Sequence, residues 1–449
     1  MKGKKNAREI AAGALYGVFY EGAYSNLSLK SLLDRYDPTP PERALASELV
    51  YGVIQNYRLL DAYIASFSKT PPHKLQRRAL IILRMAFYQL LYLERIPKSA
   101  AVSEAVKMAR KSLNLGAAGY VNGVLRAFLR SDGFSLALSD DAAERLALKY
   151  SLPEWMAAHF IESYGSEAGE RIICAANDRP AVYIRLNSYR ASEKTLINAI
   201  EADGADIRRS EALDGAYVLS CRGDPSRLNA FRQGMFFFQD ITSQFAVRAA
   251  GAREGDTVMD VCAAPGAKSF AAAQYMHGKG RIYAFDLYEN RVGLIKTAAE
   301  RLGISIIDTA VKDAEVSDDA FFESADAVIA DVPCSGLGTM AKKPDIRLKS
   351  EKELFSLPET QNKILNAASK YVKPGGTLIY STCTLNPSEN EEIVSAFLKN
   401  NPDFTALEPD TRGAPKEVMI RRQKTVTFLP DKNFGDGFFI AKMIKERRI

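Results

Sequence analysis

The sequence predicts a multidomain chain: an all-helical bundle over residues 1–132, a small α+β domain over 133–235, and an α/β domain over 236–449. Three observations predict this order. The first part has apolar residues at helical spacing and almost no strand signal, the middle part has two strand patterns around one helix, and the last part alternates strands with helices. Such alternation is typical of a parallel, doubly wound sheet.

The first part is predicted to hold about six or seven helices, because proline-rich turns interrupt its apolar stripes. The stripes are Ala12, Leu15, Tyr16 and Phe19; Leu45, Leu49, Val53 and Leu60; and Leu83, Phe87, Leu90 and Leu91, with turns at 37–41, 70–72 and 96–97. A packed bundle explains most of these Leu and Ala residues without any further function.

The other two parts contain recognisable strands. In the middle part we expect strands at 181–187 and 216–220, a helix at 192–202, and an earlier helix that carries Pro153 in its first turn. In the last part we expect strands at 257–261, 281–285, 304–311, 326–330 and 376–380, a final pair at 425–428 and 438–444, and helices that include 242–250, 269–276 and 358–371.

The composition is that of an ordinary globular protein, with 47% hydrophobic and 25% charged residues. No apolar run reaches the ~18 residues of a membrane span, and the N-terminal residues lack the apolar core of a signal peptide. Five scattered cysteines without C-x-x-C argue against disulfides, and three distant histidines argue against zinc. We therefore expect a cytoplasmic monomer without a metal or a membrane anchor.

Net charge is unevenly distributed along the chain. Residues 1–132 contain 20 Lys and Arg against 10 Asp and Glu, whereas the rest of the chain contains 40 against 44. A basic front part indicates a polyanionic partner such as a nucleic acid. Lys-rich helical surfaces also serve solubility alone, so the charge needs support from the motifs.

Two cysteines mark the most informative motifs of the α/β part. Cys334 lies in 331–336 (DVPCSG), and Cys383 lies in 380–384 (YSTCT). Both motifs follow short apolar runs expected to be strands, and a third such run ends in 262–268 (CAAPGAK). The carboxyl ends of parallel strands meet at one edge, so the three motifs should converge on one crevice. A free cysteine is often only a small buried residue, but the flanking Asp-x-Pro and Ser-Thr indicate a role here.

The turn after the first of these strands predicts a cofactor site. Small residues let a ligand approach the backbone, and the helix that follows offers free amide donors. The residues expected to line the site are Cys262, Ala263, Ala264, Pro265, Gly266, Ala267 and Lys268. Asp286 comes 20 residues after Gly266, about the spacing at which an acid meets a ribose hydroxyl. NAD could use such a turn, but G-x-G-x-x-G is missing, and Lys268 alone could be an exposed first-turn lysine.

These motifs resemble those of the RNA cytosine-C5 methyltransferases, which use S-adenosylmethionine. The family patterns D-x-C-A-A-P-G-G-K, D-x-P-C-S-G, Y-S-T-C-S, P…E-N-E and D-G-F-F correspond to 260–268, 331–336, 380–384, 387–391 and 436–439. The resemblance covers most of the chain and implies a Rossmann-like methyltransferase fold. One departure is Ala267, where the family usually has Gly. Alanine suits the start of a helix but does not suit φ > 0.

The resemblance also implies roles for the site residues. Cys383 would attack C6 of the cytosine, Asp331 would contact N3 and the amine beside the cofactor, and Cys334 would remove the C5 proton. Lys268 would lie near Asp331 and lower a thiol pKa. In the family, acids at the positions of Asp286 and Asp313 lie near the ribose and the adenine of the cofactor. The residues alone leave open which cysteine attacks, since in the related DNA enzymes the cysteine of the Pro-Cys pair does so.

The helical part resembles the domain of the antitermination factor NusB, over 45–61, 84–97 and 120–126. A NusB-like domain ahead of a cytosine-C5 methyltransferase is the arrangement of the bacterial Sun/Fmu-type enzymes, which modify one cytosine in the P-site hairpin of 16S rRNA. The resemblance therefore implies 16S rRNA as partner. The expected RNA contacts are Arg185, Asn187, Arg347 and Lys442. The alternatives are the same chemistry on tRNA, or an inactive assembly factor that only binds rRNA.

Overall fold

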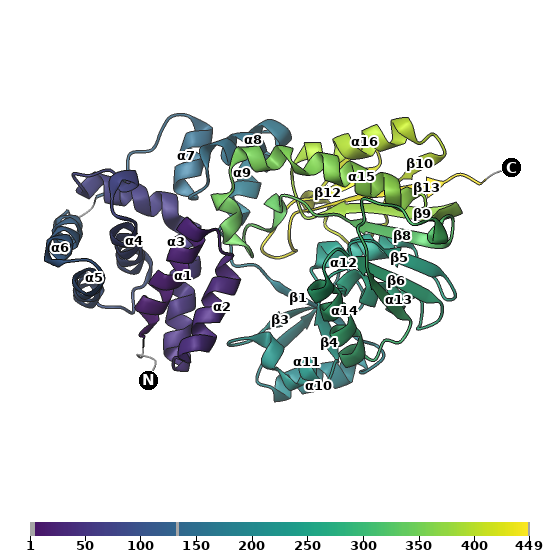
Figure 1. Ribbon diagram of the computed structural model, residues 1–449, viewed down its shortest axis with the longest axis horizontal. Helices are drawn as coiled ribbons and strands as arrows, with labels where there is room; N and C mark the ends of the chain where they lie inside the picture. Colours follow the sequence, from purple (N-terminus) through teal and green to yellow (C-terminus); the bar gives the residue numbers. More distant parts are fainter. Residues whose placement is uncertain (1–4, 132–133, 448–449) are drawn as a thin grey trace. The chain divides into compact units, whose positions relative to one another are not determined.

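The computed structural model in Figure 1 describes residues 5–131 and 134–447. The chain forms two compact units, residues 1–177 with 343–349, and residues 178–342 with 350–449. The expected boundary at 132–133 lies outside the described residues, as do the first four residues of the basic N-terminus. In the part that is described, no helix is long and apolar enough to span a bilayer, and no group of three His, Cys, Asp or Glu could hold a metal ion.

The first unit is helical throughout its described residues, which confirms the predicted bundle. Its α-helices are α1 (Ala7–Glu21), α2 (Ser25–Tyr36), α3 (Pro40–Phe67), α4 (Arg77–Tyr92), α5 (Lys98–Ser112), α6 (Leu115–Arg130), α7 (Ala142–Lys149), α8 (Glu154–Tyr164) and α9 (Ser166–Ala175). The first six of them contribute to one apolar core. Pro153 directly precedes α8, one residue before the position expected for it.

Side-chain caps define where the helices of the bundle begin. The Asn6 side chain accepts from the amide of Glu9, and the Glu9 carboxylate accepts from the amide of Asn6, which forms a capping box in front of α1. Thr39 and Glu42 form the same box in front of α3. Two prolines begin α3, where no amide donor is needed. The proline-rich turn at 37–41 therefore starts a helix as well as ending one.

A short segment, Lys343–Lys349, belongs to the helical unit although its neighbours in sequence belong to the other unit. Its 3-10 helix η5 (Pro344–Leu348) carries Arg347, whose side chain is fully buried. The Arg347 guanidinium donates to the carbonyl oxygens of Gln55 and Ala176, at 2.5 Å each. The prediction that Arg347 contacts RNA is wrong, because its side chain is fully buried and its two terminal nitrogens donate inside the protein.

The second unit contains a four-stranded antiparallel sheet in the order β2-β3-β1-β4. Its strands are β1 (Val182–Leu186), β2 (Asp206–Arg209), β3 (Ala216–Ser220) and β4 (Phe236–Phe238), and α10 (Glu193–Ala202) and α11 (Asn229–Arg232) pack on it. This confirms the predicted α+β domain with both of its strands and its helix. The short strands β2 and β4 were not predicted.

β1 is an inner strand of this small sheet, and its polar residues are buried. Arg185 donates to the side-chain oxygens of Gln274 at 2.8 Å and Gln244 at 3.0 Å. The Asn187 amide donates to two backbone carbonyls. The prediction that Arg185 and Asn187 contact RNA from a surface strand is therefore wrong. Both side chains instead join the small sheet to the larger α/β part of the same unit.

A nine-stranded mixed sheet forms the rest of the second unit, in the order β11-β12-β13-β9-β8-β5-β6-β7, with β10 beside β13. The strands are β5 (Thr257–Asp260), β6 (Arg281–Asp286), β7 (Ile307–Val311), β8 (Ala325–Asp331), β9 (Val372–Thr382), β10 (Phe404–Leu407), β11 (Met419–Arg422), β12 (Thr425–Phe428) and β13 (Phe438–Lys445). β5 to β9 pair in parallel, and β12 and β13 form an antiparallel pair, as predicted. The short strands β10 and β11 were not predicted.

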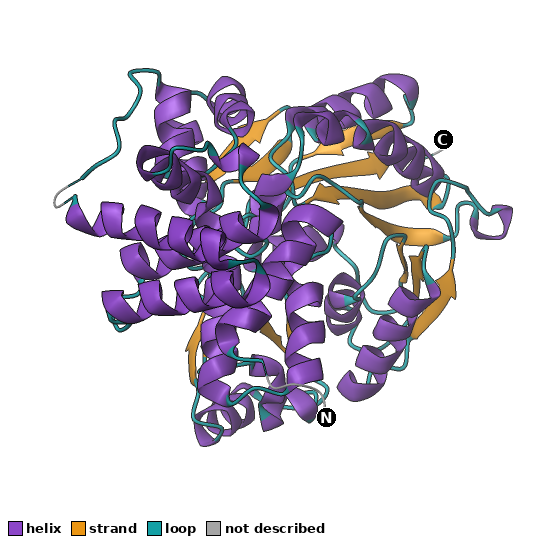
Figure 2. Ribbon diagram, turned by 60° about the vertical axis from the view of Figure 1, so that its left-hand side comes forward, coloured by secondary structure: helices purple, strands orange, loops and turns teal. Residues whose placement is uncertain are grey.

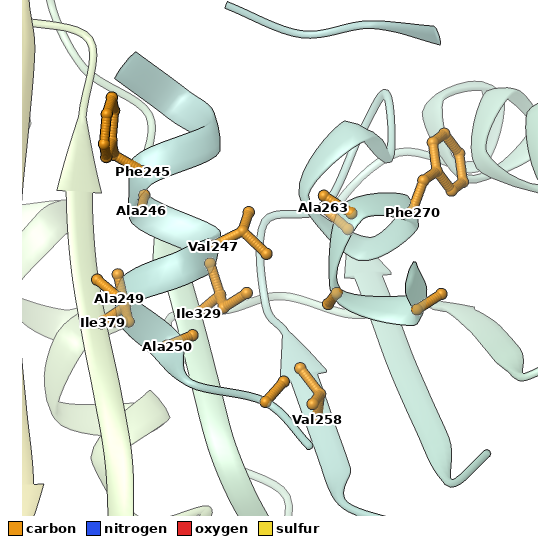
Figure 3. Packing of buried hydrophobic residues seen from close by; sticks show 14 of the residues in the cluster. Phe245, Ala246, Val247, Ala249, Ala250, Val258, Ala263, Phe270, Ile329 and Ile379 are labelled. Atoms are coloured by element: carbon orange, nitrogen blue, oxygen red, sulfur yellow. The ribbon is translucent and has the colours of Figure 1, made fainter. Parts of the chain in front are cut away.

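Helices cover both faces of this sheet, as Figures 1 and 2 show. On one face lie α12 (Ile241–Ala250), α13 (Ala267–Tyr275) and α14 (Glu289–Leu302), and on the other lie α15 (Leu357–Ser369) and α16 (Glu391–Asn400). Figure 3 shows Phe245 and Val247 of α12 in the same core as Ile329 of β8 and Ile379 of β9. The strand order reverses between β5 and β8, and this switch point is where an α/β sheet opens a ligand crevice.

Replacing Arg347 with Ala is expected to destabilise the helical unit, because two buried carbonyl oxygens lose a charged donor. We expect the free energy of unfolding in urea to fall by roughly 3 kcal/mol. The control is Lys352→Ala, which removes an exposed cation a few residues away and should leave stability unchanged. Equal stability of both variants would contradict the structural role of Arg347.

Candidate active site

The two motif cysteines meet at the carboxyl edge of the nine-stranded sheet. Cys383 directly follows β9, and Cys334 lies in the loop that follows β8. Their sulfur atoms are 3.2 Å apart, within hydrogen-bond distance for a thiol. The structure therefore brings together the two motifs that the strand-end argument placed at one crevice.

Asp331, the last residue of β8, has both carboxylate oxygens engaged. Lys268 Nζ lies 2.6 Å from Oδ2, and Ser381 Oγ donates to Oδ1 at 2.8 Å. The Lys268 ammonium also lies over the Phe438 ring, 5.4 Å from its centroid. Donors on both oxygens fix the plane of the carboxylate. Asp331 is thus held in one orientation at the edge of the cysteine site.

The environment of Cys334 disfavours its thiolate. The hydrogen bond with Cys383, burial, and the nearby acids Glu389 and Asp331 raise the pKa of the Cys334 thiol well above its usual value. Lys268 lies beside Asp331, as expected, and its charge is taken up by that carboxylate. The expected lowering of a thiol pKa by Lys268 is therefore wrong for Cys334.

A buried glutamate ties the two cysteine loops together. Glu389, shortly after β9, is fully buried and accepts from the amide of Ser335 at 2.8 Å. Asn386 donates to the same carboxylate at 3.0 Å. Ser335 is next to Cys334 in sequence, and Asn386 lies on the loop that begins at Cys383, so one carboxylate fixes both loops. Sequence reasoning quoted Glu389 only as part of the E-N-E pattern and missed this role.

A close backbone contact joins the same loops to the D-G-F-F motif. The amide of Gly338 donates to the carbonyl of Cys383 at 3.0 Å, and the amide of Gly437 donates to the carbonyl of Gly338 at 2.8 Å. A Cβ atom on Gly338 would lie 2.1 Å from the Gly437 oxygen, so no other residue fits at this position. The motif before β13 thus packs directly on the loop that follows Cys334.

A cluster of three charged side chains holds the ends of the same loops. Lys342 Nζ lies 2.5 Å from Asp240 and 2.8 Å from Asp436. Burial and the neighbouring Asp240 charge raise the pKa of the Asp436 carboxyl to about 7. Lys342 ends the loop that begins at Cys334, and Asp436 starts the D-G-F-F motif. Sequence reasoning missed this cluster, because its members lie far apart in the chain.

The cofactor turn adopts the conformation that its glycine allows. Gly266 has φ = +106°, which other residues rarely adopt, and Ala267 is the first residue of α13. The alanine in place of the usual glycine therefore falls where it favours the helix. Asp286, at the end of β6, is buried, accepts from the amide of Ala264 at 3.2 Å, and lies 3.2 Å from Arg291. Asp286 thus supports the turn from the neighbouring strand.

Asp260, the last residue of β5, is a site residue to which sequence reasoning gave no role. Ser269 Oγ donates to Oδ2 at 2.8 Å, whereas Oδ1 is buried and has no hydrogen-bond partner among the described residues. Burial raises the pKa of this carboxyl to about 7. A buried carboxylate oxygen is costly without a donor, so it suits a ligand that brings an ammonium or hydroxyl group. Asp260 is the first residue of the D-x-C-A-A-P-G pattern, and this place in the motif was the signal from which a role could have been predicted.

Asp313 lies at the same edge of the sheet as Asp286. Asp286 pairs with Val311 in the parallel ladder, and Asp313 follows two residues later. Together with Lys312 and Asp318, it lines an open pocket. Its carboxylate accepts from the amide of Glu315 at 2.9 Å, which orders the loop. The ends of β5, β6 and β7 therefore present three acids along one rim.

The whole chain matches known proteins. Residues 249–444 match the family described as 16S rRNA methyltransferase RsmB/F, residues 5–130 match the NusB family, and residues 152–224 match the RsmF/B-like ferredoxin-like domain. The probable ribosomal RNA small subunit methyltransferase B of Bacillus subtilis is 37% identical over 99% of each chain. The chain belongs to this methyltransferase family. The small subunit methyltransferase B of an Enterobacter species is 30% identical and covers 99% of this chain and 100% of its own.

Solved structures share the fold of this rRNA methyltransferase. The crystal structure of PH0851 superposes with a TM-score of 0.81 at 25% identity, over 99% of this chain and 100% of its own. NSun6 from Pyrococcus horikoshii, solved with SFG, covers 66% of this chain and 99% of its own with a TM-score of 0.58 at 22% identity, and shows the fold alone. The predicted fold class is confirmed: a NusB-like bundle, a small α+β domain and a Rossmann-like methyltransferase domain. The family match adds that the small domain is ferredoxin-like.

Removing the Glu389 carboxylate is expected to weaken the whole cysteine site. In Glu389→Ala the amide of Ser335 and the side chain of Asn386 lose a buried charged acceptor, at a cost of about 3 kcal/mol or more. Thermal unfolding should shift down, and methyl transfer to rRNA should fall at temperatures where the variant is still folded. The control is Glu392→Ala, an exposed acid on α16. A Glu389→Ala protein with wild-type stability and activity would contradict the role of the carboxylate.

The pKa of Asp260 predicts a pH-dependent stability. Its folded pKa of about 7 lies above the ordinary 3.8, so the folded state holds an extra proton between these values. The stability contribution of Asp260 is therefore largest at low pH and falls as pH rises towards 7. Asp260→Asn cannot titrate. As pH rises from about 4 to 7, the free energy of unfolding of this variant relative to wild type should therefore increase by up to roughly 4 kcal/mol. Urea unfolding at several pH values measures this, and a constant difference would contradict it.

Proposed function

We propose that this methyltransferase transfers a methyl group from S-adenosylmethionine to C5 of one cytosine in the P-site hairpin of 16S rRNA. The observation that carries this proposal is the pair of sulfurs 3.2 Å apart beside a carboxylate fixed by Lys268. Cytosine C5 is a poor nucleophile, so its methylation needs a nucleophile for C6, an acid at N3 and a base for the C5 proton. Two thiols and one oriented carboxyl group supply these three kinds of group.

The cofactor fits the rim formed by β5, β6 and β7. The turn 262–268 and the start of α13 offer small residues and free amides, and the buried Asp260 Oδ1 suits the amino group of the methionine part. Asp286 and Asp313 would face the ribose and the adenine. When bound, S-adenosylmethionine supplies an electrophilic methyl group. Lys268, held by Asp331, then joins the cofactor rim to the cytosine site.

The first chemical step is attack by one sulfur on the ring. Cys334 holds its proton tightly and can donate it as a hydrogen bond to the other sulfur, which supports Cys383 as the thiolate that attacks. A bond forms between Cys383 Sγ and C6, and the electron pair displaced towards N3 is met by a proton that Asp331 passes on from the Lys268 ammonium. The ring becomes enamine-like, and C5 can accept the methyl group.

The second step restores the aromatic ring. The C5 proton leaves, its electron pair forms the C5–C6 double bond, and the bond between C6 and Cys383 breaks with the electron pair returning to sulfur. Asp331 takes back the proton from N3 and returns it to Lys268, which restores the ion pair. Cys334 is proposed as the base for the C5 proton, because its sulfur lies next to the one that leaves. Its high pKa requires that its own proton be lost first, so elimination should be faster at higher pH.

The names of the relatives and the residues present in the site favour an active enzyme on small-subunit rRNA over the alternatives. Relatives that match the full length are named ribosomal RNA small subunit methyltransferase B, which favours 16S rRNA over tRNA. The presence of both cysteines and Asp331 favours an active enzyme over an inactive assembly factor. A stacked base cannot reach residues at the strand ends, so the target cytosine must be unpaired or flipped out.

We propose one role for each of the three parts of the chain. Residues 1–132 would bind RNA as a NusB-like domain, 133–235 would link and contact RNA, and 236–449 would carry out catalysis. Lys442, on β13, is half-buried and is retained as a candidate RNA contact. We further propose that the enzyme acts as a monomer in the cytoplasm.

Bisulfite sequencing tests the reaction and the substrate together. Unmodified 16S rRNA incubated with the enzyme and S-adenosylmethionine should contain one protected cytosine, in the P-site hairpin. Cys383→Ala should reduce this protection by at least about a thousandfold in rate, because the covalent route is lost. Protection of tRNA but not rRNA would contradict the substrate, and no protection of any RNA would favour the inactive-binder alternative.

The two cysteines should respond differently to substitution. Cys334→Ala is expected to form the bond to C6 but to release it slowly, so a protein–RNA adduct should accumulate that survives denaturing electrophoresis. Cys383→Ala should form no adduct. Cys174→Ala, remote from the site in sequence and placed in the helical unit, is the control for loss of a thiol alone. Adducts in Cys383→Ala would reverse the assignment.

A further inference from the structure

We propose that a basic groove on the ferredoxin-like domain binds the phosphate backbone of the substrate RNA; the inference rests on the proposed function. The groove lies along β1, β2 and β3 and the loop that precedes β13, all within the second unit. Its four cationic residues are Arg179, Arg208, Arg222 and Lys432. The domain was expected to contact RNA, but none of the four residues expected to do so, Arg185, Asn187, Arg347 and Lys442, lines this groove.

The cations of the groove are exposed, and the salt bridges found among the described residues include none of them. Asp206 is the one acidic residue that lines the groove. Four other acids are next to groove residues in sequence but do not line the groove: Asp178, Asp203, Asp224 and Asp431. Three of them accept hydrogen bonds from nearby amides, Asp203 from Ala230, Asp224 from Ser226 and Asp431 from Asn433. The groove therefore has a net positive charge available for an anionic ligand.

The groove lining combines the cations with a few apolar residues. Val218, on β3, is half-buried and pairs with Arg208 of β2 in the antiparallel ladder, so these two side chains share one face of the small sheet. Pro180 and Pro225 also line the groove. The four cations come from separate segments of the chain, so a polymer with several phosphates can meet more of them than a small anion can. An RNA strand has such a backbone, and its sugars and bases can cover the apolar residues.

The groove continues into the loop that leads to the reaction site. Tyr183, on β1, donates its hydroxyl to the carbonyl of Asn433 at 3.0 Å, which fixes that loop against the small sheet. Five residues later the same chain segment reaches Phe438, whose ring lies below the Lys268 ammonium. Asp436 lies between Asn433 and Phe438 and is paired with Lys342, so the loop has a defined position. One short loop therefore connects the groove with the site that contains the cysteines.

Strand alternation on β2 provides a matched pair of arginines. Successive side chains on a strand point to opposite faces, so Arg208 and Arg209 face opposite ways. Arg208 lines the groove, whereas Arg209 is ion-paired with Asp214 at 2.8 Å and is not a groove residue. Both are exposed arginines on the same short strand. Replacing either residue removes one positive charge, but the replacement of Arg209 affects the other face and also removes its ion pairs with Glu193 and Asp214.

The test compares Arg208→Gln/Arg222→Gln with Arg209→Gln/Arg232→Gln in binding a labelled 16S rRNA hairpin, by fluorescence anisotropy over a range of salt concentrations. Both variants lose two positive charges, but Arg209 and Arg232 are exposed residues that do not line the groove. The groove variant should bind about 10-fold or more weakly at moderate salt, and the slope of log K against log[salt] should become shallower by roughly 1.5, because two phosphate contacts are lost. The Arg209→Gln/Arg232→Gln protein should match wild type. Thermal unfolding of each protein confirms that folding is unchanged.

Turnover measurements separate this proposal from the proposed function. In the groove variant KM for RNA should rise while kcat at saturating RNA and the affinity for S-adenosylmethionine remain unchanged. Wild-type RNA affinity and salt slope in Arg208→Gln/Arg222→Gln would overturn the groove proposal even if methylation is normal. If wild type methylates no RNA, the proposed function fails, but the binding titration still decides whether the groove holds RNA.

Discussion

The buried carboxylate of Glu389 is the interaction on which the catalytic geometry depends. Parallel pairing of β8 with β9 brings the two cysteine loops to the same edge, but loops beyond strand ends are not fixed by the ladder itself. Glu389 accepts hydrogen bonds from both loops, and the contact between Gly338 and the Cys383 carbonyl adds a second tie. The 3.2 Å separation of the sulfurs follows from these ties. A charged acceptor in a buried site is costly unless its partners stay in place, so the loops and Glu389 hold one another.

The loop after Cys334 is anchored again further along. Lys342 is held by Asp240 and Asp436, and the next residues, Lys343–Lys349, belong to the helical unit. The loop that carries a site cysteine is thus continuous with a segment locked into the helical unit by the buried Arg347. The same ion cluster places the loop before β13, which connects the basic groove to the site. The loop after Cys334 and the loop before β13 are therefore held by the same three charged side chains.

The sequence predicted the parts of this protein that depend on local pattern. Strand–helix alternation predicted the doubly wound sheet, and small residues after β5 predicted the cofactor turn, with Ala267 at the start of a helix. Partners that are distant in sequence could not be predicted, and these include Ser381 on Asp331 and the cluster around Lys342. Arg185 and Arg347 were expected at the surface because arginine is usually exposed. Their burial depends on amide and carbonyl partners that only the folded chain brings together.

The most direct measurement is peptide mapping of the covalent complex. Cys334→Ala is incubated with S-adenosylmethionine and the 16S rRNA hairpin, digested with protease and nuclease, and analysed by mass spectrometry for a cysteine that carries a cytosine nucleotide. We expect the added mass on the peptide that contains Cys383, with the cytosine methylated at C5. Added mass on another cysteine would contradict the assignment of Cys383 as nucleophile. Methylated RNA formed by both Cys334→Ala and Cys383→Ala, with no covalent complex in either, would contradict the covalent route itself.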